Sequence, residues 1–176
     1  QTQTPVRHKL GWSASCVGGG TEHMGAYLYR FHPDDFNAQS RYGSYQELVD
    51  WPFGYAELEP YYTQAEAALG VSGNNSDQAG YVARSAPYPL PALKSHPIAD
   101  SLDDCCAALG LHSFPTPRSV NSRPYAGRPA CQYCQHCGSY GCPTGARGTS
   151  MNSLLRPAQH TGNCEIRSLC MVVRLE

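Results

Sequence analysis

Residues 16–31 read CVGGGTEHMGAYLYRF, and this stretch decides how the rest of the chain is interpreted. Three successive glycines, Gly18, Gly19 and Gly20, stand shortly before His23. Because glycine has no Cβ, such residues adopt positive φ angles and turn their N–H groups toward a bound ring or phosphate. An ordinary surface loop is the other interpretation, since glycine runs are common wherever chains turn. The stretch predicts a loop that a flat ligand can approach closely.

Two further stretches follow in order along the chain. Residues 51–62 read WPFGYAELEPYY and are followed by GVSG at 70–73, and a third stretch runs from NSRPY at 121–125 to GAR at 145–147. Together with the glycine loop, they resemble the glucose-methanol-choline family of FAD-dependent oxidoreductases. The flavin-facing segment of that family typically reads VGG-x-(T/S)-x-H-W-x-G, and Met24 replaces its tryptophan here. Within the family, the resemblance is to the flavin subunits of gluconate, glucose and fructose dehydrogenases.

The resemblance implies FAD as the cofactor and the CH–OH group of an alcohol, sugar or polyol as the substrate, with hydride transfer to flavin N5. In some members, the histidine equivalent to His23 bonds covalently to the flavin, but we expect contact without a bond. The residues that the resemblance places against the cofactor are Val17, Gly18, Gly19, Gly20, Thr21, His23 and Gly25.

The family's nucleotide-binding G-x-G-x-x-G turn and its catalytic histidine have no counterpart in these 176 residues. The sequence is therefore interpreted as an internal fragment with no catalytic residue of its own, inactive and poorly folded alone. The predicted fold class is α+β, a partial fold of this family: pieces of a Rossmann-like FAD-binding domain and the start of a substrate-binding domain. Residues 1–73 are assigned to the FAD-binding domain, 74–128 to the connection and the substrate domain, and 129–176 to a cysteine-rich return segment.

Apolar spacing predicts helices over residues 45–69, 96–110 and 149–162. Gly70 and Gly110 are the expected stops, and Pro60 is expected in a first turn. The residues expected to face the core are Leu58, Tyr61, Tyr62, Ala65 and Leu69 in the first helix and Ile98, Leu102, Cys105, Cys106 and Leu109 in the second. Extended segments are expected at 26–31, 116–120, 164–168 and 171–175, and a long irregular connection at 73–93.

Charged side chains near the glycine loop receive structural interpretations. Arg30 is expected to be buried and paired with Asp34 or Asp35, which are close in sequence. The glutamates Glu57, Glu59 and Glu66 could be mistaken for an acid–base set, but two of them lie where a helix begins. We interpret all three as solvated or capping groups.

Four thiols lie within residues 131–142: Cys131, Cys134, Cys137 and Cys142. Thiolates at such intervals can converge on one metal, so zinc, an iron–sulfur cluster and disulfides compete as interpretations. The nine cysteines of the chain are an odd number, which leaves at least one unpaired. The sequence CP-x-GA at 142–146 resembles the end of the cysteine motif in family members that also carry a three-iron cluster. The spacing before Cys142 is one residue longer here, so the ligand set is not assigned.

Composition narrows the class of partner. The formal net charge is −1, from 13 basic and 14 acidic residues, and like charges form no long run. A nucleic-acid surface, a polybasic membrane anchor and a membrane span are not expected, and the predicted partner is a small alcohol or sugar. The resemblance adds an electron-accepting subunit or a quinone, in a bacterial periplasmic or membrane-associated complex, although the sequence itself carries no localisation signal. The rival interpretation is a non-enzymatic, cysteine-rich metal-binding or electron-transfer module.

Overall fold

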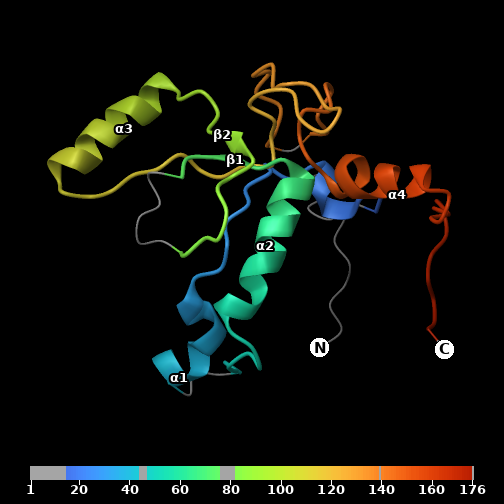
Figure 1. Ribbon diagram of the computed structural model, residues 1–176, viewed down its shortest axis with the longest axis horizontal. Helices are drawn as coiled ribbons and strands as arrows, with labels where there is room; N and C mark the ends of the chain where they lie inside the picture. The colour runs from blue at the N-terminus through green and yellow to red at the C-terminus, as the bar shows by residue number, and fades with distance from the viewer. Residues whose placement is uncertain (1–14, 44–46, 76–81, 139, 176) are drawn as a thin grey trace, which may run out of the picture.

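The structure is a computed structural model that describes residues 15–43, 47–75, 82–138 and 140–175. Helix α2 (Tyr55–Leu69) stands at its centre, and α3 (Pro97–Ala108) and α4 (Arg156–His160) extend from opposite sides (Figure 1). A two-stranded sheet lies at the upper end of α2. Helices and a small sheet occupy separate parts of the chain, so the α+β class is confirmed in this coarse form. The division at residues 73 and 128 remains a prediction.

Helix α2 begins and ends for local reasons. Glu57 Oε1 accepts a hydrogen bond of 3.2 Å from the N–H of Gly54, the N-cap residue. At the other end, Gly70 has a φ of 68°, a left-handed conformation that glycine adopts without penalty. The predicted stop is confirmed, but the predicted start at residue 45 is wrong, and Pro60 lies inside the helix rather than in its first turn.

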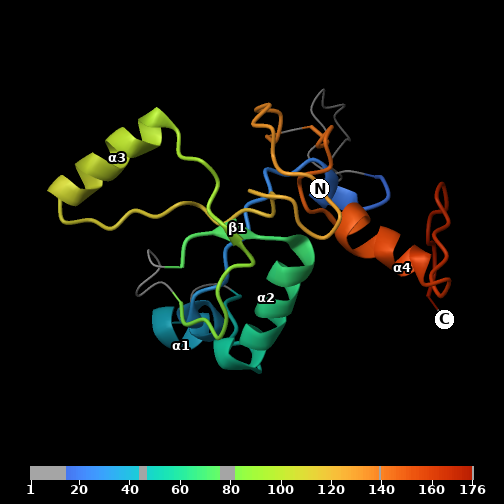
Figure 2. The same ribbon diagram turned by 45° about the horizontal axis from the view of Figure 1, so that its top comes forward.

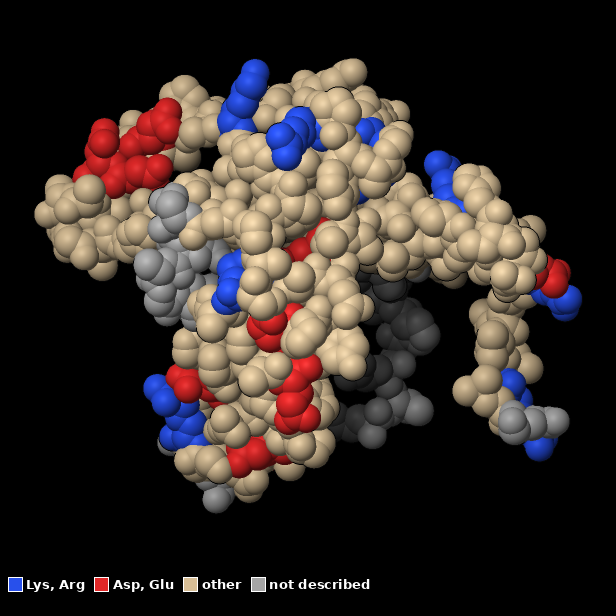
Figure 3. Space-filling view, in the orientation of Figure 1, with Lys and Arg blue, Asp and Glu red and all other residues tan. Residues whose placement is uncertain are grey.

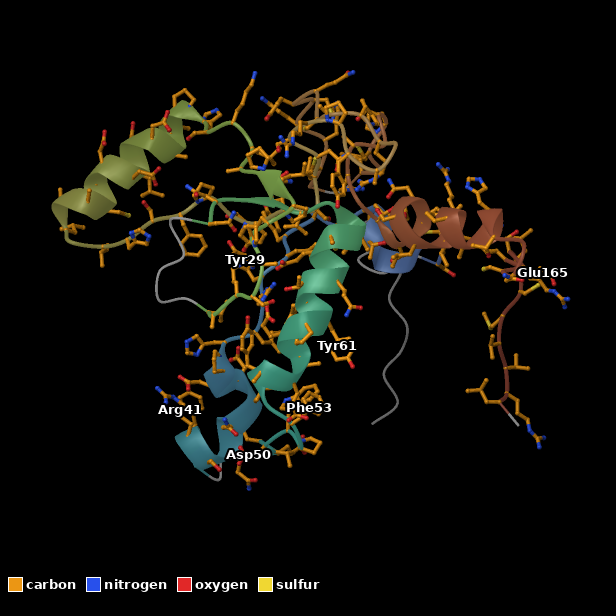
Figure 4. The ribbon with its side chains drawn as sticks, in the orientation of Figure 1. Tyr29, Arg41, Asp50, Phe53, Tyr61 and Glu165 are labelled. Carbon is orange, nitrogen blue, oxygen red and sulfur yellow. The ribbon has the colours of Figure 1, made fainter. Side chains whose placement is uncertain are left out.

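The predicted apolar face of α2 is only partly buried: Leu58, Tyr62 and Leu69 are half-buried, and Ala65 is exposed. Tyr61 is 64% exposed and points away from the helix into solvent (Figure 4). The buried residues of the helix are Tyr55 and Glu66, because the buried guanidinium of Arg30 lies against this side of the helix and donates hydrogen bonds to both.

An aromatic cluster closes the lower end of α2. The short helices η2 (Pro33–Asn37) and α1 (Ala38–Tyr42) follow the glycine loop, and η2 starts at a capping box formed by His32 and Asp35. The ring of Phe36 is buried and lies about 6 Å from each of three other rings. These rings belong to Phe31, Trp51 and Phe53.

The sheet pairs β1 (Ser72–Gly73) with β2 (Leu90–Pro91) in parallel, with Ser72 opposite Leu90. A Cβ on Gly73 would lie 2.4 Å from the ring of Tyr88, so only glycine fits there. Arg118 forms antiparallel bridges to both Tyr27 and Ser72. The predicted segments 26–31 and 116–120 therefore pair through isolated bridges and form no continuous strand, and Ala26, at the start of the first, has a left-handed φ of 63°. Tyr88 is buried beside the sheet, and Tyr81 lies outside the described residues.

Helix α3 lies at the predicted position in the sequence, but it is exposed to solvent where a buried side was predicted. His96 caps its first turn, and Gly110 has a φ of 68° just after its end. None of its residues is buried, and Ile98 is 74% exposed. Two views show α3 standing away from the rest of the ribbon (Figures 1 and 2). The predicted buried side is wrong because no other described segment packs against this helix.

The third helix forms as a π-helical turn, η3 (Met151–Leu155), that continues into α4. Thr149 and Asn152 exchange hydrogen bonds between side chains and backbone at its start. The strands predicted at 164–168 and 171–175 are wrong: both segments are irregular, and the side chains of Leu169 and Met171 are exposed. Of the described helices, none is long and apolar enough to cross a bilayer.

Candidate functional site

The glycine loop folds into a single 3-10 turn, η1 (Gly19–Glu22). Gly18 and Gly19 have φ angles of 96° and 60°, whereas Gly20 is not in the positive-φ region. A Cβ on Gly18 would lie 2.6 Å from Glu22 Oε1, but a Cβ on Gly19 would meet nothing within 4 Å. The loop therefore has a left-handed backbone and an open face at Gly19, where a flat ligand could approach.

Thr21 anchors this turn to a distant part of the chain. Its hydroxyl donates to the carbonyl of Gly18 over 2.8 Å and accepts from the N–H of Ser150 over 3.0 Å. Ser150 directly precedes η3. Thr21 thus supports the loop, and its contact with the cofactor remains a prediction.

Two buried polar atoms of the loop have no hydrogen-bond partner among the described residues. They are Glu22 Oε1 and His23 Nδ1. A buried polar atom without a partner costs about 1–3 kcal/mol, so these atoms fit a site that a polar ligand completes. Sequence reasoning selected His23 and missed Glu22, which no motif position singled out.

Gly25 closes the loop on its other side. Its carbonyl accepts two hydrogen bonds from the Arg118 guanidinium, at 3.2 Å from Nε and 2.7 Å from Nη2. A Cβ on Gly25 would lie 2.6 Å from the ring of Tyr27. Val17 lies half-buried at the start of the same turn. All seven residues predicted to face the cofactor therefore belong to one continuous, anchored loop.

Arg147 ties the loop to the cysteine segment, and sequence reasoning gave it no such role. Its guanidinium is fully buried and donates to four carbonyls. Two of these belong to the loop, Met24 at 2.7 Å and Glu22, and two to the cysteine segment, Cys137 at 3.1 Å and Tyr140 at 2.8 Å. The only signal in the sequence was its place in the motif GAR at 145–147.

The four clustered thiols are all free cysteines, and the disulfides considered among them are not formed. Cys134 is exposed, whereas Cys131, Cys137 and Cys142 are half-buried. Within the described residues, no three His, Cys, Asp or Glu side chains are arranged to hold a metal ion. In this arrangement, the side chains do not fit an iron–sulfur cluster or a zinc ion. Metal binding by Cys131, Cys134, Cys137 and Cys142 remains a prediction from the sequence.

Hydrogen bonds surround the Cys142 thiol. Burial acts to raise the pKa of this thiol, but hydrogen bonds from the Thr144 side chain and from the N–H groups of Arg147, Thr144 and Gly145 outweigh burial and lower that pKa. The lowered pKa favours the thiolate, which is the more nucleophilic form.

Arg30 is buried, as predicted, but its partners are not Asp34 and Asp35. Its guanidinium donates to Glu66 over 2.8 Å on two atoms and to Glu59 over 2.8 Å. Arg84 also pairs with Glu66. Glu57 is the capping group that was expected, whereas Glu59 and Glu66 are not solvated, because they neutralise two arginines inside the fold.

The charges in this cluster shift one another. Burial acts to lower the pKa of Arg30, but hydrogen bonds with Glu66, Tyr55 and Glu59 outweigh it and raise that pKa. The pKa of Glu59 falls to about 2, chiefly because the N–H of Ser85 and the Arg30 guanidinium donate to it. Burial acts to raise the pKa of Glu66, but Arg30 and Arg84 together lower it. The cluster is ionised at neutral pH and serves the structure.

Comparison with curated proteins finds relatives along nearly the whole chain, whereas no protein-family model matches it. The chain is 36% identical over 165 residues to a 6'''-hydroxyparomomycin C oxidase of Streptomyces lividus, a match that includes 94% of this chain and 30% of that protein. It is 37% identical over 131 residues to the fructose dehydrogenase large subunit of Gluconobacter japonicus, covering 74% and 23%. The gluconate 2-dehydrogenase flavoprotein of Pantoea cypripedii is 26% identical, covering 99% and 33%. The chain thus spans about a third or less of the length of these relatives.

Proposed function

We propose that this chain, which belongs with the glucose-methanol-choline oxidoreductases, forms the flavin-facing part of an FAD-dependent enzyme that oxidises a CH–OH group of a sugar, polyol or alcohol. The observation that carries the proposal is the glycine loop. It combines two left-handed glycines, an open face at Gly19, and two buried polar atoms, on Glu22 and His23, that lack partners among the described residues. Similarity to named oxidases and dehydrogenases over 94% of the chain supports the same function.

In this proposal, the chain's own residues bind and orient the cofactor. The backbone at Gly19 lets the flat ring approach, and His23 Nδ1 and Glu22 Oε1 provide the polar contacts at its edge. Thr21 and Arg147 keep the loop in this conformation through Ser150 and the cysteine segment. When bound, FAD supplies the hydride acceptor. The base that takes the hydroxyl proton is not among these residues, and neither is the turn that binds the ADP half.

The finer assignments belong to the same proposal. Residues 1–73 and 129–176 contribute to the FAD-binding side, and residues 74–128 begin the substrate side. The donor is a small alcohol or sugar, and a quinone, oxygen or a partner subunit reoxidises the flavin. The proposed reaction does not involve an iron–sulfur cluster, because the described thiols are not arranged to hold a metal ion.

The test compares two glycines with equal backbone demands in the natural protein that contains this chain. Gly19 and Gly110 both have positive φ, and an added Cβ meets nothing within 4 Å at either position. A branched side chain costs about 1–3 kcal/mol at such a φ. The unaltered protein should show flavin absorption bands at about 370 and 450 nm. Gly19→Val should lose these bands, whereas Gly110→Val should keep them. Equal flavin content in both variants, or a metal without flavin in the unaltered protein, would contradict the proposal.

A second test concerns the attachment of the cofactor. We propose that His23 contacts the flavin without a covalent bond. Acid precipitation should therefore release the yellow cofactor into the supernatant. Colour that stays in the pellet and disappears in His23→Ala would establish a covalent bond instead.

A further inference from the structure

A cavity of about 480 Å³ lies between the segment before α3, the extended segments at Tyr27 and Arg118, and the cysteine segment. Its walls carry two cations, Lys94 and Arg118, and two phenol rings, Tyr27 and Tyr133. Among the described residues that line it, none is Asp or Glu. Acidic side chains gather instead over α3 and along α2 (Figure 3).

Lys94 is held at the cavity by Tyr133. Its Nζ lies 5.4 Å from the centre of the Tyr133 ring, and its backbone N–H donates to the Tyr133 hydroxyl over 3.1 Å. In the part of the chain that the structure describes, no carboxylate forms an ion pair with Lys94. The ammonium group is exposed and its charge is not compensated.

Arg118 contributes the second cation to the lining of the cavity. Its guanidinium carbon lies 5.1 Å from the centre of the Tyr27 ring, and its Nε and Nη2 donate to the carbonyl of Gly25. That partner is neutral, and none of the ion pairs among the described residues includes Arg118. These contacts hold the guanidinium charge in one place beside the ring, which suits an anionic ligand.

The residues before α3 complete the wall of the cavity. Ser95 and His96 line it and precede the first turn of the helix. The N–H groups of that turn are already bonded: Ile98 donates to His96 Nδ1 over 3.2 Å, and Ala99 donates to the His96 carbonyl over 2.7 Å. The acidic residue of the turn, Asp100, bonds to the Ser95 hydroxyl and does not line the cavity. The positive charge at the cavity therefore comes from Lys94 and Arg118, neither of which is in an ion pair among the described residues.

We propose that this cavity binds a small organic anion, with its carboxylate or phosphate held by Lys94 and Arg118 and its hydroxylated or apolar body against Tyr27 and Tyr133. The charges and the rings both contribute, since a bare halide would leave the rings unused. This site is distinct from the open face at Gly19, and the proposed binding of the anion does not require FAD. Arg118 nevertheless joins the two, because the carbonyl to which it donates belongs to Gly25 of the glycine loop.

The test uses four sugars of similar size and different charge, with the natural protein in its purified form. D-gluconate and glucose 6-phosphate carry the two anionic groups, D-glucose is neutral, and D-glucosamine is cationic. Calorimetric titration should show binding of at least one anion about tenfold or more tighter than glucose, a difference of about 1.4 kcal/mol. Glucosamine should bind no better than glucose. Whichever of D-gluconate and glucose 6-phosphate binds more tightly shows whether the site prefers a carboxylate or a phosphate.

Variants locate the binding. Lys94→Gln changes an exposed side chain and should weaken anion binding several-fold without unfolding the protein. Arg118→Gln should weaken it at least as much, and Arg118→Lys should restore part of it if the fold is intact. Arg123→Gln is the control, because Arg123 is exposed and lies outside the cavity. Equal affinity for gluconate, glucose 6-phosphate and glucose, or equal losses in Lys94→Gln and Arg123→Gln, would overturn the proposal. Flavin content is measured in parallel, so a protein that binds the anion but no FAD would refute the redox function alone.

Discussion

Two buried arginines, Arg30 and Arg147, differ in how their positive charges are compensated. Arg30 is 3% exposed and is bonded to the carboxylates of Glu59 and Glu66. Arg147 is fully buried and donates to the carbonyl oxygens of four residues; among the described residues no carboxylate pairs with it. The first site carries its own counter-charges, and the second does not.

The difference shows where the charge of a buried arginine is compensated by carboxylates of the chain and where it is compensated by carbonyl dipoles. Charge pairs compensate the cost of burying an ion only when their geometry and hydrogen bonds are good. Around Arg30 these conditions are met between α2 and the segments beside it. Around Arg147, carbonyl dipoles provide the compensation, and its Nε has no partner in the described part of the chain. The loop that we assign to the cofactor is therefore held by a cation that favours a nearby negative or polar group.

The largest expected effect breaks the first site. Glu66→Gln removes the carboxylate shared by Arg30 and Arg84 and leaves two buried guanidinium groups without it. Loss of one partner from a buried ion pair costs about 3–5 kcal/mol. Urea unfolding should report a loss of that size, and Glu57→Gln, at an exposed cap, should change the free energy of unfolding far less. Equal losses in the two variants would mean that the cluster adds nothing beyond a surface carboxylate.

A smaller effect is expected at the second site, and it should appear in cofactor binding. Arg147→Lys keeps the charge but loses the planar fork that reaches four carbonyls, so the glycine loop should loosen. We expect FAD affinity to fall about tenfold, or about 1.4 kcal/mol. Arg128→Lys is the matched control, because Arg128 is also buried and donates to the carbonyls of Leu69 and Ala146, away from the loop. If both variants lose flavin equally, Arg147 has no special relation to the loop.

Acid should separate the two sites as well. The folded-state pKa of Glu59 is about 2, below its ordinary value of 4.5. A lowered carboxyl pKa contributes stability that is present above pH 4.5 and is lost as the pH falls toward 2. Thermal unfolding measured from pH 6 to pH 2 should show a decline in that window, and the decline should be shallower in Glu59→Gln. Among the described residues no carboxylate pairs with Arg147, so Arg147→Lys should leave the slope unchanged. Parallel slopes in the unaltered protein and Glu59→Gln would contradict the assignment.

The smallest effect is expected on α3, which touches neither arginine. Leu102 is 60% exposed, so Leu102→Ser should change the free energy of unfolding by about 0.5 kcal/mol or less. Leu90→Ala, in the buried sheet, should cost about 2–5 kcal/mol. A loss near 2 kcal/mol for Leu102→Ser in the natural protein would show that another segment covers this helix.

Local sequence determined the parts of this protein that depend on backbone chemistry over a few residues. Glycines in left-handed conformations end α2 and follow α3 at the predicted positions, Gly70 and Gly110. The glycine loop, its histidine and the α+β class were also predictable, because glycine runs and apolar spacing act within one or two turns. The resemblance to sugar and alcohol oxidoreductases came from these same short motifs.

Tertiary structure alone decided which side chains meet. Arg30 pairs with Glu66, 36 residues away, rather than with the neighbouring aspartates, and Arg147 reaches the Glu22 carbonyl 125 positions away. The exposure of α3 follows the same rule, since an apolar stripe is buried only where another segment lies against it. Spacing along the chain fixes which face of a helix is apolar or charged. The partner of that face depends on packing between distant segments, which no local pattern encodes.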